Sequence, residues 1–386
     1  MIYLVIQGIY PNTAANNRYL GFLKAFQQLD IDHVNVVVCP DKQFTKIEES
    51  IYGKTVYLYR FNRKKNAVIN TIAYALLTRL VNPQFLVNNF FKSITSDNTV
   101  IVFNTRMLSF VAHANVHGFH LYNEITEHPY AYKMFKNEIL YKEYFRNCLN
   151  LDGLFTISTK LKDYFIKLGF DSSKIQIINM TVDSSRFDGL VRQKVEPYIA
   201  YCGSVSNGKD GVDDLIKSFA IVSKRIKNIK LYIIGKYLDE DVQSSNFKLI
   251  ESLGLSSRVF FTGMIAAKDM PQLLVNAKIL ALARPSNLQA DYGFPTKLGE
   301  YLLSETPVVI TRTGDIPLFL TDEFNALLCN PGDCEAIAQK MLWVLENEKE
   351  AKLIGKRGKE VALRHFDYIS ETKKIILHLK ERKDVK

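Results

Sequence analysis

Short apolar runs alternate with longer amphipathic stretches along almost the whole of the 386-residue chain. In the first half the apolar runs lie at residues 2–6, 33–38, 55–59, 99–103, 119–122, 153–157 and 175–178. In the second half they lie at residues 198–202, 230–234, 259–262, 279–283, 307–311 and 326–329. Runs of this length indicate buried strands, and the stretches between them show helical spacing, as at Leu20, Leu23 and Phe26. Repeated strand–helix alternation predicts an α/β protein with parallel sheets covered by helices on both faces.

The alternation occurs twice, and a polar stretch between residues 186 and 197 separates the two occurrences. We therefore expect two Rossmann-like domains, residues 1–190 and residues 191–365. Residues 366–386 form a polar, Lys-rich helix that we expect to pack back on the first domain. Tandem parallel-sheet domains place the carboxyl ends of their strands toward a shared cleft, which is where α/β folds bind ligands.

Composition restricts the partners and the compartment. The chain has 50 Lys and Arg residues against 40 Asp and Glu residues, and its net charge of +10 favours anionic partners such as phosphates, nucleic acid or acidic lipid. The basic residues are dispersed and match no nucleic-acid-binding motif, which argues against nucleic acid. The 5 cysteines form no C-x-x-C pair, so neither a disulfide framework nor a zinc site is expected, and a reducing cytoplasm fits best. No run approaches the roughly 18 apolar residues that span a bilayer.

The strongest local motif is D-Y-G-F-P-T-K-L-G-E at residues 291–300, between a predicted strand and a predicted helix. Pro295 suits the first helical turn, where its missing N–H costs nothing, and free backbone amides at a helix start favour a phosphate. Lys297 and Glu300 would share one helix face, which offers an ammonium for a diphosphate and a carboxylate for a ribose diol. A surface ion pair between these two residues is the alternative interpretation, and the better one for this motif taken alone.

A second motif spans residues 198–211 and combines a strand, a loop with Gly203 and Gly208, and a helix start. Glycines allow backbone amides to approach an anion, and Lys209 adds a positive charge. The spacing matches neither the Walker loop nor the dinucleotide-binding fingerprint. Gly235 ends the next predicted strand, which by itself indicates only a tight turn.

As a set, these motifs resemble the retaining glycosyltransferases of family 4, which have the GT-B fold. The resemblance covers nearly the whole chain. It also rests on Gly263, on residues 180–187, on Thr306-Pro-Val-Val-Ile310, and on Gly314-Asp315.

The resemblance implies that Glu300 holds the donor ribose and that Lys209 and Lys297 neutralise the donor diphosphate. The other residues that it assigns to donor binding are Gly8, Arg18, Gly203, Ser204, Gly235, Phe294, Pro295 and Thr296. For Gly8 and the loop after it, an ordinary strand–helix turn is an equal alternative. The chain departs from the family at two donor contacts. Tyr292, beside Asp291, stands where many members have a second glutamate, and Ser204 stands where many have an arginine.

Residues 122–129 follow a predicted strand and resemble the family's loop that places a polar residue near the reacting sugar. His128 is the main catalytic candidate, because an imidazole can donate to a sugar hydroxyl or take a proton. Glu127 beside it is the second candidate. The alternative for His128 is a loop histidine that is bonded to backbone.

Two further segments have more than one interpretation. Asp239-Glu240-Asp241 has the D-x-D spacing of a metal site, but it is more typical of the acidic first turn of a helix, so we expect no metal and no other cofactor. The basic run from Arg60 to Lys65 precedes an apolar helical pattern at Ile69, Ile72, Leu76, Leu77, Leu80 and Val81. Such a segment is typical of docking on an anionic membrane or a lipid-linked acceptor, and a packed helix with a solvated basic end explains it almost as well.

We therefore predict a cytoplasmic enzyme, at most peripheral on the inner face of the membrane. It would transfer a hexose- or N-acetylhexosamine-type sugar from a nucleotide-diphosphate sugar to a glycan or lipid-linked acceptor in surface polysaccharide biosynthesis. The alternatives are a GT-B-fold nucleotide-sugar 2-epimerase, a nucleic-acid-binding protein and a non-catalytic scaffold.

Overall fold

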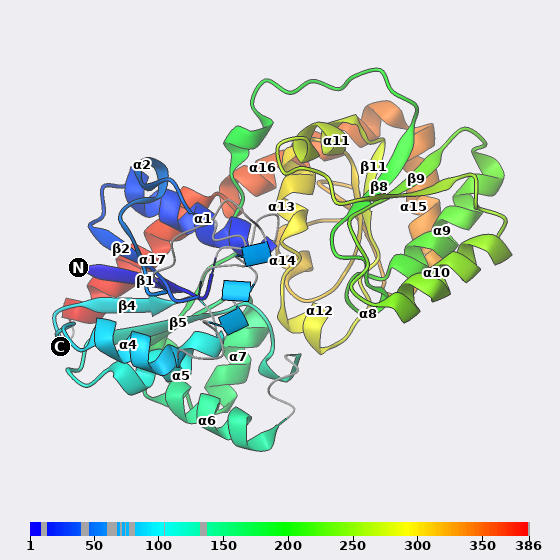
Figure 1. Ribbon diagram of the computed structural model, residues 1–386. Coiled ribbons are helices and arrows are strands. Elements are labelled where there is room, and N and C mark those ends of the chain that lie inside the picture. Colours follow the sequence, from blue (N-terminus) through cyan, green and yellow to red (C-terminus); the bar gives the residue numbers. More distant parts are fainter. Residues whose placement is uncertain are drawn as a thin grey trace. The chain divides into compact units, whose positions relative to one another are not determined.

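The computed structural model describes residues 1–8, 14–39, 46–59, 68–69, 72–73, 75–76, 82–103, 105–131 and 137–384 (Figure 1). The chain divides into two compact units. Unit 1 comprises Met1–Asn179 and Tyr368–Lys386, and unit 2 comprises Met180–Asp367.

Unit 1 is built on a seven-stranded sheet with the strand order β3-β2-β1-β4-β5-β6-β7. The strands are β1 (Ile2–Ile6), β2 (His33–Val37), β3 (Thr55–Tyr57), β4 (Thr99–Val102), β5 (His120–Ile125), β6 (Gly153–Thr156) and β7 (Ile175–Ile177). All neighbouring strands pair in parallel. The order runs outward in both directions from β1, which is the doubly wound arrangement that strand–helix alternation predicts.

Helices connect these strands and bury the faces of the sheet. They are α1 (Ala14–Gln28), α2 (Glu49–Tyr52), α4 (Pro83–Phe91), α5 (Thr105–Ala114), α6 (Glu138–Leu149), α7 (Thr159–Lys167) and α17 (Tyr368–Asp384), with short turns η1 (Pro129–Ala131) and η3 (Ser172–Lys174). The core joins strand residues such as Leu4 and Ile101 to Phe22 and Phe26 of α1. The last helix, α17, contributes Leu379 to the same core, so the end of the chain returns to unit 1.

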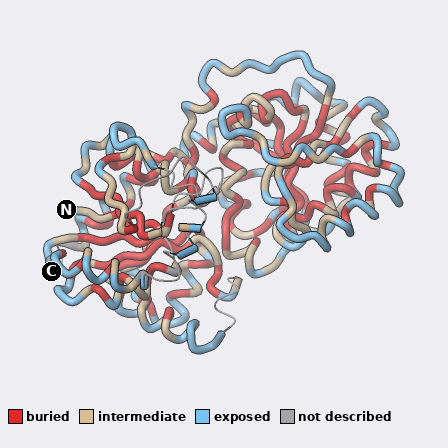
Figure 2. The backbone as a smooth tube through the Cα atoms, in the orientation of Figure 1, coloured by how far each residue is buried: buried red, intermediate tan, exposed pale blue. Residues whose placement is uncertain are grey.

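Unit 2 contains a six-stranded parallel sheet with the order β10-β9-β8-β11-β12-β13. Its strands are β8 (Tyr198–Cys202), β9 (Lys230–Ile234), β10 (Val259–Gly263), β11 (Ile279–Leu282), β12 (Val308–Thr311) and β13 (Leu327–Cys329). The longer helices are α9 (Val212–Arg225), α10 (Glu240–Ser252), α15 (Cys334–Glu346) and α16 (Glu348–His365). The shorter ones are η4 (Ser184–Phe187), α8 (Asn207–Asp210), α11 (Met270–Asn276), α12 (Leu288–Tyr292), α13 (Lys297–Leu303) and α14 (Ile316–Phe319). In both units the buried residues concentrate along the strands (Figure 2).

The boundary between the units lies between Asn179 and Met180 rather than after residue 190. The reason is the packing of the intervening segment on α13. A Cβ added at Gly299 of α13 would lie 3.1 Å from the Cβ of Val182 and closer still to the side chain of Met180. Val182 also donates its backbone N–H to the carbonyl oxygen of Phe366 (2.8 Å). Residues after Asn179 are therefore held by unit 2.

The predicted fold class is confirmed. The strands of both sheets coincide with the apolar runs to within a few residues, and both sheets are parallel. Within the described part of the chain, no helix is both long enough and apolar enough to cross a membrane.

Candidate functional site

The loops that follow β8, β9 and β10 meet at the carboxyl edge of the unit 2 sheet. Gly203 donates its backbone N–H to Ile234 (2.9 Å), and Gly235 donates its own to Gly263 (2.9 Å). Gly235 has a φ of 137°, and a Cβ there would lie 2.9 Å from the carbonyl carbon of Gly203 and closer still to its oxygen. Only glycine permits this approach, so the predicted Gly203 and Gly235 form one packed feature.

The ammonium group of Lys297 lies against the backbone of Gly203. A Cβ added at Gly203 would lie 2.8 Å from Cε of Lys297 and closer still to Nζ. The lysine comes from α13 and the glycine from the loop after β8, so the structure brings the two predicted motifs together. The Lys297 side chain is 17% exposed, whereas that of Asp210 is 1% exposed.

Lys297 forms an ion pair with Asp210, at the end of α8. The hydroxyl of Tyr201 lies 2.7 Å from Oδ2 of the same aspartate and 3.3 Å from Nζ of Lys297. Arg284, which follows β11, places Nη1 3.7 Å from Oδ1 of Asp210. Burial alone would raise the pKa of Asp210, but Lys297 and Arg284 outweigh it and hold that pKa below its ordinary value. Burial lowers the pKa of Lys297, and Asp210 opposes this effect.

Glu300 lies one turn further along α13 and pairs with Arg186 of η4. Arg186 also donates from Nη2 to the carbonyl oxygen of Ala267 (2.8 Å), which fixes the guanidinium. The sequence left open an ion pair between Lys297 and Glu300. The structure instead gives each of them its own partner, and both side chains remain partly exposed.

Lys209 and Ser204 lie in the same loop region. The backbone N–H of Lys209 donates to the hydroxyl of Ser206 (3.2 Å), which caps α8, and the Lys209 side chain is half-buried. Ser204 is exposed, and its carbonyl oxygen lies 2.8 Å from the hydroxyl oxygen of Tyr201.

The segment before α13 is held mainly by packing. The Phe294 ring is buried edge-on against Phe319 (5.7 Å between ring centroids) and also packs on Phe366 (5.4 Å). Pro295 is buried and its carbonyl oxygen accepts a hydrogen bond from Leu298 (3.0 Å), while Thr296 is half-buried. The Phe294 side chain therefore belongs to the core of unit 2, and any donor contact would come from its backbone.

Asp291, the possible substitute for the missing second glutamate, has local partners. One carboxylate oxygen accepts a hydrogen bond from the hydroxyl of Ser286 (2.7 Å), and the other lies 3.4 Å from the backbone nitrogen of Gly314. These contacts tie the loop before α12 to the loop after β12. Tyr292 beside it is half-buried.

In unit 1, Gly8 is buried directly after β1, and residues 9–13 of the predicted loop lie outside the described residues. Arg18 on α1 is 3% exposed and engaged at every nitrogen. Its Nε pairs with Glu124 (2.6 Å), Nη1 donates to the carbonyl oxygen of Asn179 (2.5 Å), and Nη2 donates to that of Ile178 (3.0 Å). The guanidinium thus ties α1 and β5 to the residues after β7, and a role for Arg18 in donor binding stays a prediction.

His128 lies in the loop after β5 and is 4% exposed. Its Nδ1 accepts a hydrogen bond from the backbone N–H of Tyr130 (3.3 Å), and its ring packs on Tyr164 (4.3 Å between centroids). Burial lowers the pKa of His128, so the ring is neutral at pH 7. A neutral imidazole that accepts at Nδ1 carries its proton on Nε2 and can donate from there. Glu127 beside it is half-buried.

The D-x-D segment is a helix cap. Oδ1 of Asp239 accepts hydrogen bonds from the backbone N–H groups of Asp241 (2.9 Å) and Val242 (3.1 Å) at the start of α10. In the described part of the chain, no three His, Cys, Asp or Glu residues gather as a metal site would require.

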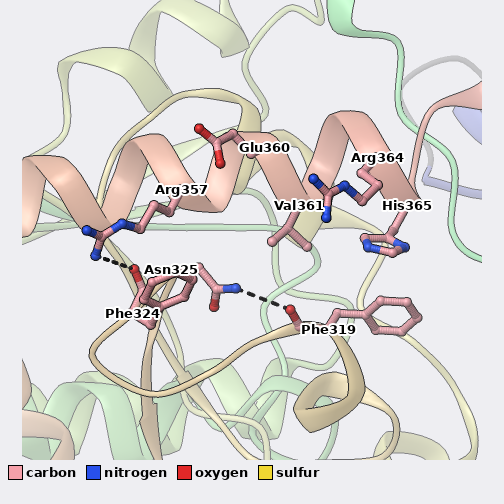
Figure 3. A pocket seen from close by; sticks show the side chains of 8 residues that line it. All are labelled: Phe319, Phe324, Asn325, Arg357, Glu360, Val361, Arg364 and His365. Carbon is pink, nitrogen blue, oxygen red and sulfur yellow. Dashed lines mark hydrogen bonds between the residues drawn. The ribbon is translucent and has the colours of Figure 1, made fainter.

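A pocket with a volume of about 190 Å³ lies on unit 2 between α16 and the end of α14 (Figure 3). It is lined by Phe319, Phe324, Asn325, Arg357, Glu360, Val361, Arg364 and His365. None of the predicted site residues lines it. Arg357 donates to the carbonyl oxygen of Phe324 (3.4 Å) and Asn325 to that of Phe319 (3.4 Å), so its polar groups hold the surrounding loop.

The sequence analysis did not identify three charged residues of the unit 2 site: Arg186, Asp210 and Arg284. One signal for Arg284 was present, because a charged residue directly follows the apolar run 279–283. A charge at the carboxyl end of a central strand lies at the edge where α/β folds bind ligands. Asp210 had no comparable signal, since aspartate at a helix start is usually exposed.

Comparisons with known proteins agree with the unit 2 motifs. Residues 185–361 match the family model described as glycosyl transferases group 1. The chain is 24% identical to mannosylfructose-phosphate synthase of Agrobacterium fabrum over 265 residues, which is 63% of this chain and 57% of that protein. It is 26% identical to the capsular polysaccharide biosynthesis glycosyltransferase CapM of Staphylococcus aureus over 198 residues, 50% of this chain and 49% of that protein. The matches thus span about half the length of these relatives.

Solved structures resemble the whole chain. The crystal structure of Anabaena HepE in complex with UDP-glucose superposes with a TM-score of 0.76 at 16% identity and covers 98% of this chain and 99% of its own. The lipopolysaccharide outer core galactosyltransferase WaaB gives a TM-score of 0.67 at 16% identity over 99% of both chains. These likenesses establish the fold. They show that the chain has the GT-B fold, and residues 185–361 of unit 2 match the group 1 (family 4) glycosyl transferases.

Proposed function

We propose that this protein transfers a sugar from a nucleotide-diphosphate sugar to a glycan or lipid-linked acceptor. The observation that carries the proposal is the arrangement on α13. Lys297 lies against Gly203, while Glu300 lies one turn away and pairs with Arg186. A nucleoside diphosphate presents a diphosphate next to a ribose diol. The ammonium matches the first group and the carboxylate matches the second.

The chemistry of such a transfer requires mainly charge stabilisation. The bond between the anomeric carbon and the diphosphate oxygen breaks, and the acceptor hydroxyl oxygen bonds to the same face of that carbon. The acceptor proton passes to the departing diphosphate. Fixed cations and backbone N–H groups that await the diphosphate favour this step because they need no rearrangement when the charge develops. Lys297 and Lys209 are the cations in this proposal, and Arg186 keeps Glu300 oriented.

Surface polysaccharide biosynthesis is the pathway we propose. The support is the similarity to CapM, described as a capsular polysaccharide biosynthesis glycosyltransferase, and to WaaB, described as a lipopolysaccharide outer core galactosyltransferase. Both descriptions concern bacterial surface glycans. The donor sugar in this proposal is a hexose or an N-acetylhexosamine.

The proposal is tested first by thermal denaturation with a panel of nucleoside diphosphates and nucleotide sugars. A ligand at about 100 times its Kd stabilises the folded state by about 2.7 kcal/mol, which gives a clear upward shift of Tm. The ligand with the largest shift is then incubated with the protein and candidate glycan acceptors. A shift by no nucleotide would contradict the proposal. Rapid conversion of the donor without any acceptor would favour the 2-epimerase instead.

Glu300 provides a residue-level test. Glu300→Ala should weaken nucleotide binding by roughly 10- to 100-fold, because a hydrogen bond to a charged group contributes about 1.5–3 kcal/mol. Glu346→Ala is a matched control, since Glu346 is also a helical glutamate of unit 2 paired with an arginine, Arg225 (2.9 Å). Calorimetry should show the loss for Glu300→Ala alone. Equal affinities for Glu300→Ala and the wild type would remove Glu300 from the site.

A further inference from the structure

We infer that Asp210 is a positioning residue for the donor diphosphate. Its buried carboxylate fixes the ammonium of Lys297 against the backbone of Gly203, where that ammonium serves as a cation for the diphosphate. The inference rests on the proposed function and deepens it, because it assigns a role to a residue that contacts no ligand itself.

The carboxylate of Asp210 is almost completely removed from solvent, with 1% of the side chain exposed. A carboxylate in this environment is costly unless it is paired and hydrogen-bonded. Asp210 meets this condition at Oδ2 through Lys297 and the hydroxyl of Tyr201, while Oδ1 has no hydrogen bond among the described residues and lies 3.7 Å from Nη1 of Arg284. Because Tyr201 belongs to β8 and is itself buried, the aspartate is anchored to the centre of the sheet.

Lys297 is the more exposed member of the pair. An ammonium has three N–H donors. Two of them point to Asp210 and Tyr201 among the described residues, and the side chain is 17% exposed. The third donor is therefore suited to a phosphate oxygen. Asp210 also removes the rotamer freedom of the lysine before the ligand arrives, which lowers the entropic cost of binding.

Arg284 explains why the negative charge of Asp210 does not cancel the positive charge of Lys297. The Arg284 side chain is 2% exposed, and its Nη1 lies 3.7 Å from Oδ1 of Asp210, whereas Lys297 pairs with Oδ2. The two cations and one carboxylate leave this cluster with a net charge of +1. A diphosphate that approaches Lys297 therefore meets a positive field, strengthened because the cluster lies in the protein interior.

The alternative is that Lys297 and Asp210 form a buried ion pair with a structural role only. The two roles predict a different dependence of nucleotide affinity on pH when Asp210 is replaced. The groups that face the Lys297 ammonium are Asp210 of α8, Arg284 after β11, and Tyr201 and Cys202 of β8. Asp210 is the anionic group among them at neutral pH, and it opposes the lowering of the Lys297 pKa by burial. Loss of the carboxylate should let Lys297 lose its proton at a lower pH.

The test is the affinity of full-length Asp210→Asn for UDP, measured by calorimetry between pH 7 and 9. Asparagine keeps the size of the side chain and its bond with Tyr201 but removes the charge. We expect binding weaker by roughly tenfold at pH 7. A deprotonated lysine cannot serve as the cation. The UDP affinity of Asp210→Asn should therefore fall more steeply with rising pH than the UDP affinity of the wild type. An affinity equal to that of the wild type across this range would overturn the inference.

Two further variants separate positioning from folding. In Lys297→Met, the added change Asp210→Asn should cost no further affinity, since Asp210 acts through the lysine. Additive losses would overturn the inference. Asp322→Asn is the control, because Asp322 is a partly buried aspartate of unit 2 that pairs with Arg312 and Lys340, and we expect it to leave UDP affinity unchanged.

If Asp210→Asn does not fold, Tyr201→Phe serves instead. It removes one hydroxyl that supports the pair, and a smaller loss of UDP affinity in the same direction is expected. A folded Tyr201→Phe with wild-type affinity at pH 7 and pH 9 would overturn the inference. If the wild-type protein binds none of UDP, GDP and ADP, the proposed function is contradicted as well. If the wild type binds one of them and the variants bind it equally well, only the inference about Asp210 is contradicted.

Discussion

At the scale of single residues, buried charges acquire partners from distant parts of the chain. Lys297 pairs with Asp210, Glu300 with Arg186, and Arg18 with Glu124. Each pair leaves one side chain fixed in a single orientation, which is the condition for a preorganised site. The pairs in unit 2 hold a cation and a carboxylate on neighbouring turns of α13. The pair in unit 1 has no exposed member and holds the core.

His128 is predicted to contact the reacting sugar through Nε2–H. His128→Ala should then lower kcat by about 10-fold or more, which is the usual effect of removing a positioned hydrogen-bonding group. The nucleotide affinity should stay close to that of the wild type. Steady-state kinetics with the identified donor and acceptor, together with calorimetry, checks both values. Transfer at the wild-type rate would leave His128 with a structural role, through its bond to Tyr130 and its packing on Tyr164.

The lowered pKa of His128 predicts how the stability of the protein depends on pH. Its pKa is lowered by burial, so the folded state favours the neutral ring and the unfolded state takes up the proton first as pH falls below about 6.5. The resulting stability is present above that pH and is lost on acidification. The Tm of His128→Phe should therefore fall less than that of the wild type between pH 7 and pH 5. His378 shifts in the same direction and remains in both proteins, so a shallower slope is expected rather than a flat one.

At the scale of elements, the site depends on loops that approach each other at the ends of β8 and β9. Gly235→Ala introduces a Cβ that overlaps the carbonyl group of Gly203, at a φ of 137° that disfavours other residues. We expect a lower Tm and a nucleotide affinity reduced by at least tenfold, because the loop that carries Gly203 must move.

The control for this substitution is Gly254→Ala. Gly254 also has a positive φ of 67°, but a Cβ there would meet no atom within 4 Å. Gly254→Ala should lower Tm through backbone strain alone and leave nucleotide affinity unchanged. If both variants bind nucleotide as the wild type does, the contact between Gly203 and Gly235 does not shape the site.

The segment after Tyr59 is the element predicted to contact a membrane. The basic run Arg60 to Lys65 lies outside the described residues, and the side chains of Val68, Ile69, Ile72 and Leu76 are exposed. Each basic residue near an anionic surface contributes about 1 kcal/mol, and salt weakens the attraction. The protein should therefore sediment with vesicles of phosphatidylcholine and phosphatidylglycerol at low salt.

The membrane prediction has two controls. Vesicles of phosphatidylcholine alone should retain much less protein, and a variant with Ile69→Ser and Ile72→Ser should bind the mixed vesicles less tightly than the wild type. Protein that stays in the supernatant with the anionic vesicles at low salt would rule the contact out.

At the scale of the whole molecule, the +10 charge and the fixed cations of unit 2 suggest how a leaving diphosphate would be neutralised in the proposed reaction. We predict that catalysis needs no divalent metal and survives exhaustive treatment with EDTA. Asp239→Asn with Asp241→Asn should be nearly silent, because asparagine also caps helices well. Lys209→Ala with Lys297→Ala should abolish transfer. Loss of activity in EDTA that magnesium or manganese restores would show instead that a metal supplies the charge.

The sequence by itself determined the two parallel sheets and the positions of their strands. These features depend on local patterns, because the spacing of apolar residues and the glycines after strands act over a few residues. The cap at Asp239 was predictable for the same reason. The motifs also placed Lys297 and Glu300 on neighbouring turns, since helical spacing is fixed.

The tertiary structure alone decided the partners of those residues. Lys297 and Asp210 are 87 positions apart, Glu300 and Arg186 are 114 apart, and Arg18 and Glu124 are 106 apart. With 50 basic and 40 acidic residues in the chain, sequence patterns do not specify which charges meet. Packing selects them, because a buried charge is tolerated only where the folded chain supplies a partner. The same packing buried Arg18 and Phe294 and moved the unit boundary to Asn179, as the segment after it closes on Gly299.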